Sequence, residues 1–425
     1  MWTFKSFTEA VGKNTAADAG LIPRNDYLCI MENMYIARKA IRKLPGKIMK
    51  NVPMPDPEII EGFGCRAEAG RKCKEAGFSN VLILTDKTLS SLGYADAVKK
   101  SLDKEGISYE IYDGIASEPR LEYIETGRTI ALKNSAECII SLGGGSVMDT
   151  GKMIAAGCRL KHLPTSLLLQ KFLIVPEKTL PIFAIPSTAG TGAEMTVGAV
   201  ISKESGSKFA SVISGLDVQK VFLDSELTVK APWKITAACG IDALSHGLEG
   251  CIADIRSSED DIEKSRRCVR LVLENLPRLK EHPEDVSARS AMCLAANLGG
   301  NAINKQLAGY VHAFAHSIGA RYHISHGEAI ALCLLPVMHS QRDSCTEQLS
   351  ALAHYCSLND ADALFKSLEK LIAECGLNLD GSFVRPEDFD ELSIAIAKDS
   401  VNYSAPMTFG HSQIINILSE INKNR

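Results

Sequence analysis

Residues in the second half of the chain have the types and spacing of a metal site. Asp242 and His246 are four apart in a segment with helical periodicity, so both side chains lie on one face and can chelate one ion. Four of the ten histidines then fall within one short stretch, at His312, His316, His323 and His326. An isolated histidine is usually a hydrogen-bonded structural residue, but this clustering predicts that several imidazoles converge on an ion.

The donor atoms of these residues indicate which metal ions the site could bind. Three imidazoles with one carboxylate suit Fe(II), Zn(II) or Co(II). Because no thiolate takes part, a catalytic metal is favoured over a structural zinc. His312 and His316 share a helical face, residues 317–325 are predicted to form a turn, and the next helix is predicted to begin at His326. We expect His323 on the turn, at the surface or the wall of a pocket.

A glycine run in the first half is placed to bind phosphate. Gly143, Gly144 and Gly145 follow an apolar strand pattern and precede Ser146, which we expect to cap the next helix. Backbone N–H groups at the start of a helix can face a pyrophosphate. Three glycines can also form no more than a tight strand-to-helix turn, so this alternative stays open.

Two further features favour a dinucleotide. Asp86 ends an earlier strand, where a carboxylate can bind the adenosine ribose hydroxyls and repel a 2′-phosphate, which favours NAD over NADP; the alternative is a turn-forming aspartate. Residues 187–192, STAGTG, form a small hydroxyl-rich loop after another strand and are predicted to line the cofactor groove. The glycine run follows the acidic residue instead of preceding it by about 20 residues, so this is not the standard G-x-G-x-x-G arrangement.

Apolar periodicity indicates the elements that position these groups. From residue 80, strand and helix patterns alternate and predict a βαβαβ unit with a parallel sheet. The runs PIFAIPS, GAVIS and KVFLD are expected to extend the same layer to about residue 226. From residue 232 the pattern is almost wholly helical. We therefore predict an N-terminal extension (residues 1–48), a Rossmann-like α/β dinucleotide-binding domain (49–231) and an all-helical metal-binding domain (232–425).

Composition excludes several classes of protein. A chain of 425 residues is long enough for two domains, and 47 basic against 51 acidic residues, scattered along the chain, leave no nucleic-acid footprint. The thirteen cysteines occur without a C-x-x-C pair, which favours a reducing cytoplasm. Neither a secretion signal nor a membrane span is expected.

Four ordered motifs resemble those of the iron-containing, or group III, alcohol dehydrogenases. They are SLGGGSVMDTGK, IPSTAGTGAEMT, GIDALSHGLEG and YVHAFAHSIGARYHISHGEAIALCLLPVM. The resemblance runs from about residue 55 to about residue 420. It implies an NAD-binding domain, a helical domain that holds a metal, catalysis between them, a small alcohol or aldehyde as substrate, and a homo-oligomer of two or more chains.

The resemblance also implies roles for individual residues. It implies metal ligands at Asp242, His246, His312 and His326. Fe(II) would be favoured over Zn(II), and His316 would be a proton relay near the substrate. The residues implied to contact NAD are Asp86, Gly144, Gly145, Ser146, Asp149, Ser187, Thr188, Thr191, Val200 and Lys208.

The reaction implied is metal-dependent hydride transfer between a short primary alcohol or diol and NAD. Relatives often have Asn-Pro-Arg where this chain has Ser404-Ala405-Pro406, which we expect to alter the edge of the pocket and hence the substrate. Three alternatives stay open: a lyase similar to dehydroquinate synthase, an enzyme similar to glycerol dehydrogenase, and a non-catalytic scaffold that has kept the fold.

Overall fold

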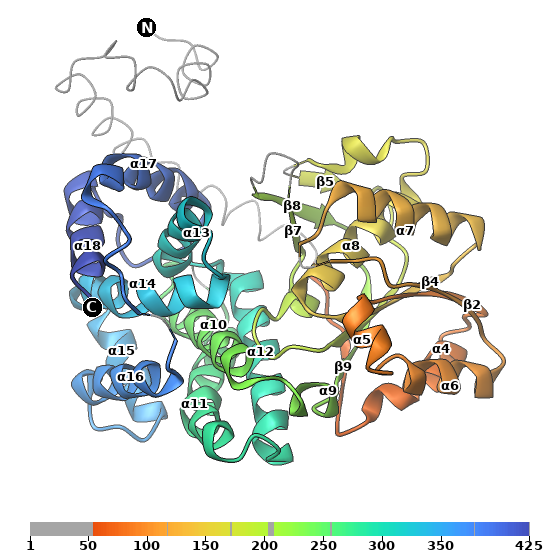
Figure 1. Cartoon of the computed structure of the whole chain (residues 1–425), viewed down its shortest axis with the longest axis horizontal. Helices are drawn as coiled ribbons and strands as arrows, with labels where there is room; N and C mark the ends of the chain where they lie inside the picture. The colour runs from red at the N-terminus through yellow and green to blue at the C-terminus, as the bar shows by residue number, and fades with distance from the viewer. Residues whose placement is uncertain are drawn as a thin grey trace, which may run out of the picture.

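The structure, a computed structural model, describes residues 54–424 except 117, 171, 203–207, 256 and 378. These residues form an α/β half and a helical half that lie side by side (Figure 1). The predicted fold class is confirmed. The expected N-terminal extension, residues 1–48, lies outside the described residues.

A six-stranded parallel sheet forms the centre of the first half. In spatial order its strands are β1 (Glu58–Glu61), β9 (Val218–Leu223), β6 (Ile182–Pro186), β4 (Cys138–Gly143), β2 (Asn80–Leu84) and β3 (Ser108–Tyr112). The central strands are nearly continuous apolar runs because helices cover both faces of the sheet. Their register places Ile139 of β4 beside Leu82 of β2 and Ile182 of β6.

The helices of this half form a layer on each face of the sheet. They are α4 (Ala69–Glu75), α5 (Lys87–Ser91), α6 (Asp96–Glu105), α7 (Leu121–Lys133), α8 (Gly145–Arg159) and α9 (Glu226–Val229). Helices α7 and α8 pack together on one face, and α4 packs against α6 on the other (Figure 1). Because strand side chains alternate, Leu82 joins the first core and Ile83 the second.

A separate sheet holds three strands in the order β5 (Phe172–Ile174), β8 (Lys208–Ser214) and β7 (Gly198–Ser202). The prediction that GAVIS extends the main layer is therefore wrong, since this run forms β7. It pairs antiparallel with β8, which follows it directly along the chain. Apolar periodicity identifies a strand, but it does not identify the strand's partner.

The second half is helical, as predicted. Its helices are α10 (Trp233–Cys251), α11 (Glu259–Glu281), α12 (Val286–Gln306), α13 (Tyr310–Tyr322), α14 (His326–Gln341), α15 (Thr346–Tyr355), α16 (Ala361–Cys375), α17 (Phe389–Asp399) and α18 (His411–Lys423). They share one apolar core, and α10 is buried along most of its length. Within the described part of the chain, no helix is both long and apolar enough to cross a membrane.

Polar contacts join the two halves through α12. Asn297 of α12 donates from Nδ2 to Oε1 of Glu194, which lies in the 3-10 helix η3 (Ala193–Met195), over 3.2 Å. Two helical turns further along α12, Oδ1 of Asn304 accepts a hydrogen bond of 2.9 Å from the backbone N–H of Val197. The side chains of Glu194, Asn297 and Asn304 are buried, so the two halves meet through hydrogen-bonded polar groups as well as apolar ones.

Two glycines bring the backbones of the two halves into direct contact. Gly192 has a φ of +57° and precedes η3, and Gly300 lies in the middle of α12. A Cβ atom added at Gly300 would lie 2.1 Å from the carbonyl oxygen of Gly192. The close approach therefore requires glycine at this position of α12.

Candidate functional site

Helix α10 carries three ionisable side chains on one face. Asp242, His246 and Glu249 are spaced i, i+4 and i+7, which places them along one stripe of the helix. Each is at most 3% exposed. Buried charges are stable only when they are paired or bind a metal, so this stripe needs partners.

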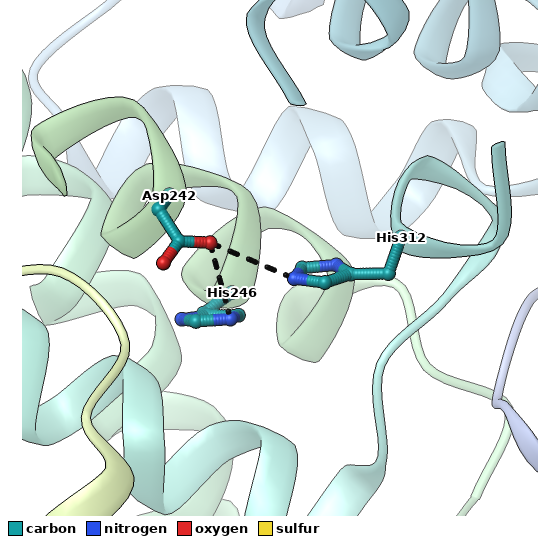
Figure 2. Close-up of side chains that lie close together, drawn as sticks. All are labelled: Asp242, His246 and His312. Atoms are coloured by element: carbon teal, nitrogen blue, oxygen red, sulfur yellow. Dashed lines mark ion pairs between the residues drawn. The ribbon is translucent and has the colours of Figure 1, made fainter. Parts of the chain in front are cut away.

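Two further histidines complete a cluster around one carboxylate oxygen. The Oδ1 atom of Asp242 lies 3.5 Å from Nε2 of His246, 3.7 Å from Nε2 of His312 and 3.2 Å from Nε2 of His326. His312 lies in the first turn of α13, and α14 begins at His326, as the sequence predicts. Figure 2 shows Asp242 and His246 of α10 facing His312 of α13. The structure thus brings together all four residues expected to be metal ligands.

Three atoms of this cluster are buried without a hydrogen-bond partner. They are Oδ1 of Asp242, Nε2 of His312 and Nδ1 of His246. Buried polar atoms are nearly always satisfied, and an ion is one of the recognised explanations for an exception. Because lone pairs on carboxylate and imidazole bind Fe(II) and Zn(II), the residues fit a divalent cation. The side chain of His326 is 35% exposed, so the cluster is accessible on that side.

The electrostatics of the cluster also favour a cation. Burial lowers the pKa of His246 to about 4, so this imidazole is neutral and can be a ligand. Burial opposes ionisation of Asp242, but the surrounding imidazoles hold its pKa well below its usual range. Against the effect of burial, the charge of Glu249 helps to raise the pKa of His312 to about 10. Two buried carboxylates therefore attract positive charge, which a proton or a metal ion can supply.

Glu249 was not singled out from the sequence. Its carboxylate accepts hydrogen bonds from Nδ1 of His312 at 2.6 Å and from the backbone N–H groups of Gly309 at 2.8 Å and Val311 at 2.7 Å. A carboxylate on one ring nitrogen fixes a histidine with the other nitrogen free for a metal. The signal was available in the sequence, because Glu249 follows Asp242 at the i+7 position of the same helical stripe.

His316 lies beside the cluster. Its ring centroid is 5.3 Å from that of His326 and 5.8 Å from that of His312. Its Nδ1 atom faces away to two other groups, Oδ2 of Asp399 at 3.2 Å and the hydroxyl of Tyr403 at 3.0 Å. The predicted turn over residues 317–325 is wrong in extent, since α13 continues to Tyr322. A glycine within that run is tolerated in the helix, whose end is formed by His323 in the left-handed conformation.

The residues expected to bind the cofactor lie at the carboxyl edge of the main sheet. Asp86 follows β2, Gly144 follows β4 and Ser187 follows β6, and these three strands are neighbours in the order β6-β4-β2. This edge of a parallel sheet is where α/β proteins bind their ligands. Asp86 also caps α5, because its Oδ1 accepts from the N–H of Leu89 at 2.9 Å. Because this capping bond uses only Oδ1, Asp86 can form the turn and still contact a ribose.

The glycine run and the hydroxyl-rich loop pack against each other. The backbone N–H of Ser187 donates to the carbonyl of Gly143 over 2.9 Å. An added Cβ at Gly145 would lie 3.3 Å from Oγ1 of Thr191, and one at Gly144 would lie 3.6 Å from Thr188. Ser146 is not the helix cap that we expected, because α8 begins at Gly145 and Gly144 is its N-cap. With no side chain at the cap, the first N–H groups of α8 remain available to an anion.

The remaining expected cofactor residues are structurally linked. Asp149 accepts from the N–H of Val200 at 2.9 Å and from Nζ of Lys152 at 3.0 Å, one bond to each carboxylate oxygen. Lys152 is buried and donates also to the carbonyl of Gly198 at 2.6 Å. Asp149 thus ties α8 to β7. Lys208 is the first residue of β8, where its backbone pairs opposite Ser202, and its side chain lies outside the described part.

Comparison with known proteins gives consistent results. The family description "Iron-containing alcohol dehydrogenase" matches residues 56–223, and "Fe-containing alcohol dehydrogenase family, C-terminal" matches residues 236–422. Alcohol dehydrogenase 4 of Schizosaccharomyces pombe is 31% identical over 364 residues, which cover 83% of this chain and 85% of the relative.

Solved structures are similar over nearly the whole described chain. A sulfoacetaldehyde reductase from Bifidobacterium kashiwanohense in complex with NAD⁺ has a TM-score of 0.82 at 25% identity and covers 88% of this chain and 99% of its own. A 1,3-propanediol oxidoreductase has a TM-score of 0.80 at 26% identity, with coverages of 87% and 99%. The chain therefore has the same two-part architecture as these enzymes.

Proposed function

The chain belongs to the iron-containing alcohol dehydrogenase family and is an NAD-dependent alcohol and diol oxidoreductase, and from this premise we propose which of its residues carry the reaction. A divalent metal is held by Asp242, His246, His312 and His326. The observation that carries this assignment is the pair of unpartnered buried atoms, Oδ1 of Asp242 and Nε2 of His312, which face each other over 3.7 Å. When bound, a divalent cation polarises the oxygen of an alcohol or aldehyde.

We propose iron(II) as the native metal, with zinc(II) as the alternative. The donor set of three imidazoles and one carboxylate accepts both ions. The protein's own contribution is to hold these donors in place and to keep the imidazole of His246 neutral, as its lowered pKa supports. Metal analysis of protein purified without added metal distinguishes the two ions.

We propose that NAD lies along the carboxyl edge of the main sheet. Its pyrophosphate would face the first N–H groups of α8 at Gly144, Gly145 and Ser146. The loop residues Ser187, Thr188 and Thr191 line the same edge, and Asp86 stands where it would bind the adenosine ribose and exclude NADP. Asp149, Val200 and Lys208 are proposed as further contacts on the β7–β8 side.

His316 is proposed as the proton relay. Its ring lies beside the rings of His312 and His326, and its Nδ1 atom is already engaged by Asp399 and Tyr403. A neutral imidazole can accept the hydroxyl proton when an alcohol is oxidised, and in the reverse direction the imidazolium can give a proton to the oxygen of the aldehyde that is reduced.

The organisation of the whole chain is proposed as well. We place the boundary between the two domains near residue 231, after the last strand of the main sheet and before α10. The twelve cysteines among the described residues are free thiols, which supports a reducing cytoplasm. A homo-oligomer of two or more chains is supported by the exposed apolar side chains Phe172 and Ile174 on edge strand β5, and light scattering tests it.

The experiment that tests the assignment is anaerobic oxidation of NADH with a panel of short aldehydes and diol-derived aldehydes. It uses protein stripped of metal and then restored with Fe(II) or Zn(II). Turnover that returns with the metal supports the proposed ligands and ranks the substrates. Tight metal and NAD binding without turnover on any aldehyde would refute the proposed division of roles.

A further inference from the structure

Two residues beyond the expected site enclose one nitrogen of His316. Asp399 is the last residue of α17, and Tyr403 follows the 3-10 helix η6 (Ser400–Asn402). Oδ2 of Asp399 lies 3.2 Å from Nδ1 of His316, and the Tyr403 hydroxyl lies 3.0 Å from the same atom. Burial and the negative charge of Asp399 both raise the pKa of the Tyr403 hydroxyl, which therefore stays protonated. Two polar groups thus meet at a single ring nitrogen.

The position of the tyrosine is fixed by the residue that follows it. Ser404 donates from its hydroxyl to Oδ1 of Asp254 over 2.9 Å and accepts from the N–H of Asp254 over 2.9 Å. Its backbone N–H donates to the carbonyl of Ala308, just before α13, over 2.8 Å. The segment is thus tied both to the loop after α10 and to the start of the helix that carries His316. The phenol is held beside the imidazole by backbone anchors and not by its own contacts alone.

The arrangement determines where the imidazole carries its proton. A neutral imidazole has one N–H and one lone pair. A carboxylate can only accept a hydrogen bond, so a lone pair on Nδ1 would face the Asp399 carboxylate unfavourably. A hydroxyl oxygen can also accept, so the Tyr403 hydroxyl at 3.0 Å fits the same tautomer. The contact between Asp399 and His316 is favourable only when Nδ1 carries the proton.

We propose that Asp399 and Tyr403 are positioning residues that keep the proton of His316 on Nδ1 and so leave the lone pair on Nε2 for the substrate. The inference rests on the proposed function of His316 as the proton relay. In alcohol oxidation the substrate O–H bond breaks and its proton moves to Nε2, while the hydride leaves to NAD⁺. The resulting imidazolium is stabilised by the Asp399 carboxylate, and the reverse transfer applies in aldehyde reduction.

The tautomer can be measured directly. Protein labelled with ¹⁵N-histidine and loaded with diamagnetic Zn(II) is studied by long-range ¹⁵N–¹H correlation NMR, and His316→Gln assigns the signal. We expect a pyrrole-type Nδ1 and a pyridine-type Nε2 in the unaltered chain. In Asp399→Leu the preference is lost, and in Tyr403→Phe it is weakened. An Nε2–H tautomer in the unaltered chain, or the same tautomer in Asp399→Leu, would overturn the inference.

Kinetics provide a second readout. Asp399→Leu should lower kcat by about 10- to 100-fold, the usual effect of losing a partner that orients a histidine, with KM and metal content nearly unchanged. The matched control is Asp390→Leu, on the same helix, whose Oδ1 lies 3.4 Å from Nε2 of a different histidine, His411. It should leave both kcat and the His316 signal as they are. Full turnover in Asp399→Leu contradicts this role.

The measurements distinguish a failure of the proposed function from a failure of the inference about the His316 tautomer. If the unaltered chain reduces no aldehyde, the proposed function is wrong whatever the NMR spectrum shows. If turnover is normal but the tautomer is unaffected by Asp399→Leu, only this inference is wrong. Should Asp399→Leu not fold, Tyr403→Phe removes one hydroxyl from the same contact and gives both readouts.

Discussion

At the scale of single residues, the candidate centre depends on carboxylates that hold imidazoles in defined orientations. Oδ1 of Asp242 lies within 3.7 Å of three imidazole nitrogens, while Glu249 holds the far side of His312. Asp399 has the corresponding position on His316. A histidine that must present one chosen nitrogen needs an acceptor at the other, and Glu249 and Asp399 supply it for His312 and His316.

Glu249→Gln should weaken metal binding by about 10- to 100-fold. The amide keeps the size of the side chain but loses the charge that orients His312 and makes it a better donor. Competition with a chelator measures the change in metal affinity. Glu263→Gln is the control, because Glu263 is hydrogen-bonded only to the hydroxyl of Tyr355 among the contacts described, on the exposed side of α11. Equal affinities in the two variants would contradict the orienting role.

Asp86→Ser should relax the preference for NAD over NADP. Serine retains the capability to cap α5, whose first turn depends on the bond from Leu89, but it removes the negative charge that repels a 2′-phosphate. The measurement is the ratio of kcat/KM for NADH and NADPH, which should shift toward NADPH by at least tenfold, or about 1.4 kcal/mol. Asp360→Ser changes an equivalent cap on α16 and should leave the ratio constant.

The residue pattern predicts part of this site. The i, i+4 spacing of Asp242 and His246 on a helix is visible in the sequence because it is local. Asp399 and Tyr403 contact His316 across 83 and 87 residues of sequence, and no local pattern encodes such a contact. Glu249 lies between these cases, since its helical position is local but its bond to His312 is tertiary.

At the scale of elements, the contact between η3 and α12 places an acidic group in the interior. Glu194 is 3% exposed and accepts one bond from Asn297. Burial raises the pKa of Glu194 above its ordinary value of 4.5. The folded state therefore binds this proton more tightly than the unfolded state does. The contribution to stability is fully present below pH 4.5 and is lost as the pH rises through the higher, folded-state pKa.

Glu194→Gln should therefore raise the melting temperature at pH 7 to 8 and flatten its fall above pH 4.5. The amide oxygen of glutamine can still accept from Asn297, and the variant has no charge to bury. Thermal unfolding between pH 4 and pH 8 measures the effect. Glu274→Gln, at a side chain that is 60% exposed, should leave the pH profile as it is. A lower melting temperature for Glu194→Gln at pH 8 would show that the charge itself is stabilising.

Whether a segment forms a helix or a strand can be predicted from the sequence where the apolar periodicity is long. The pairing partner of each strand cannot. The helices α6, α7, α8 and α11 and the strands β2, β3 and β4 lie where the apolar spacing indicates. Strands β1, β5 and β8 were not predicted, and β7 was assigned to the wrong sheet. Strand β1 is an edge strand whose partner, β9, is distant along the chain, so its four residues carry little signal.

At the scale of the whole molecule, the position of the carboxyl edge of the main sheet relative to the candidate metal ligands depends on how α12 meets η3. Gly300→Ala inserts a methyl group where the carbonyl of Gly192 already lies 2.1 Å from the added atom. Overpacking of this kind costs about 1–3 kcal/mol of unfolding free energy. Because the shift also moves the two halves apart, KM for NADH should rise while metal affinity stays constant.

The control for this prediction is Gly319→Ala in α13. An added Cβ there would lie 3.6 Å or more from its nearest neighbours, so the exchange should be neutral or stabilise the helix by about 0.5–1 kcal/mol. Chemical denaturation and a metal titration of both variants test the comparison. Equal stability of the two variants would mean that the backbone contact adjusts without cost.

The division into an α/β half and a helical half follows from the sequence because the dominant period changes near residue 232. The order of the six strands does not follow, since it depends on which pairs of apolar runs meet in space. The contact of Gly192 with Gly300 was also beyond local reasoning. The local sequence does not distinguish Gly192 and Gly300 from other glycines, because the close approach of their two backbones is a tertiary contact.

The four candidate ligands are distributed over α10, α13 and α14, and this distribution has a consequence for biosynthesis. A ribosome delivers the α/β half first, then Asp242 and His246, and only much later His312 and His326. A nascent chain that has released α10 offers one carboxylate and one imidazole of the candidate set, too few donors to retain an ion against the cellular pool. A site built from these four residues can therefore hold its ion only after α14 has begun to emerge.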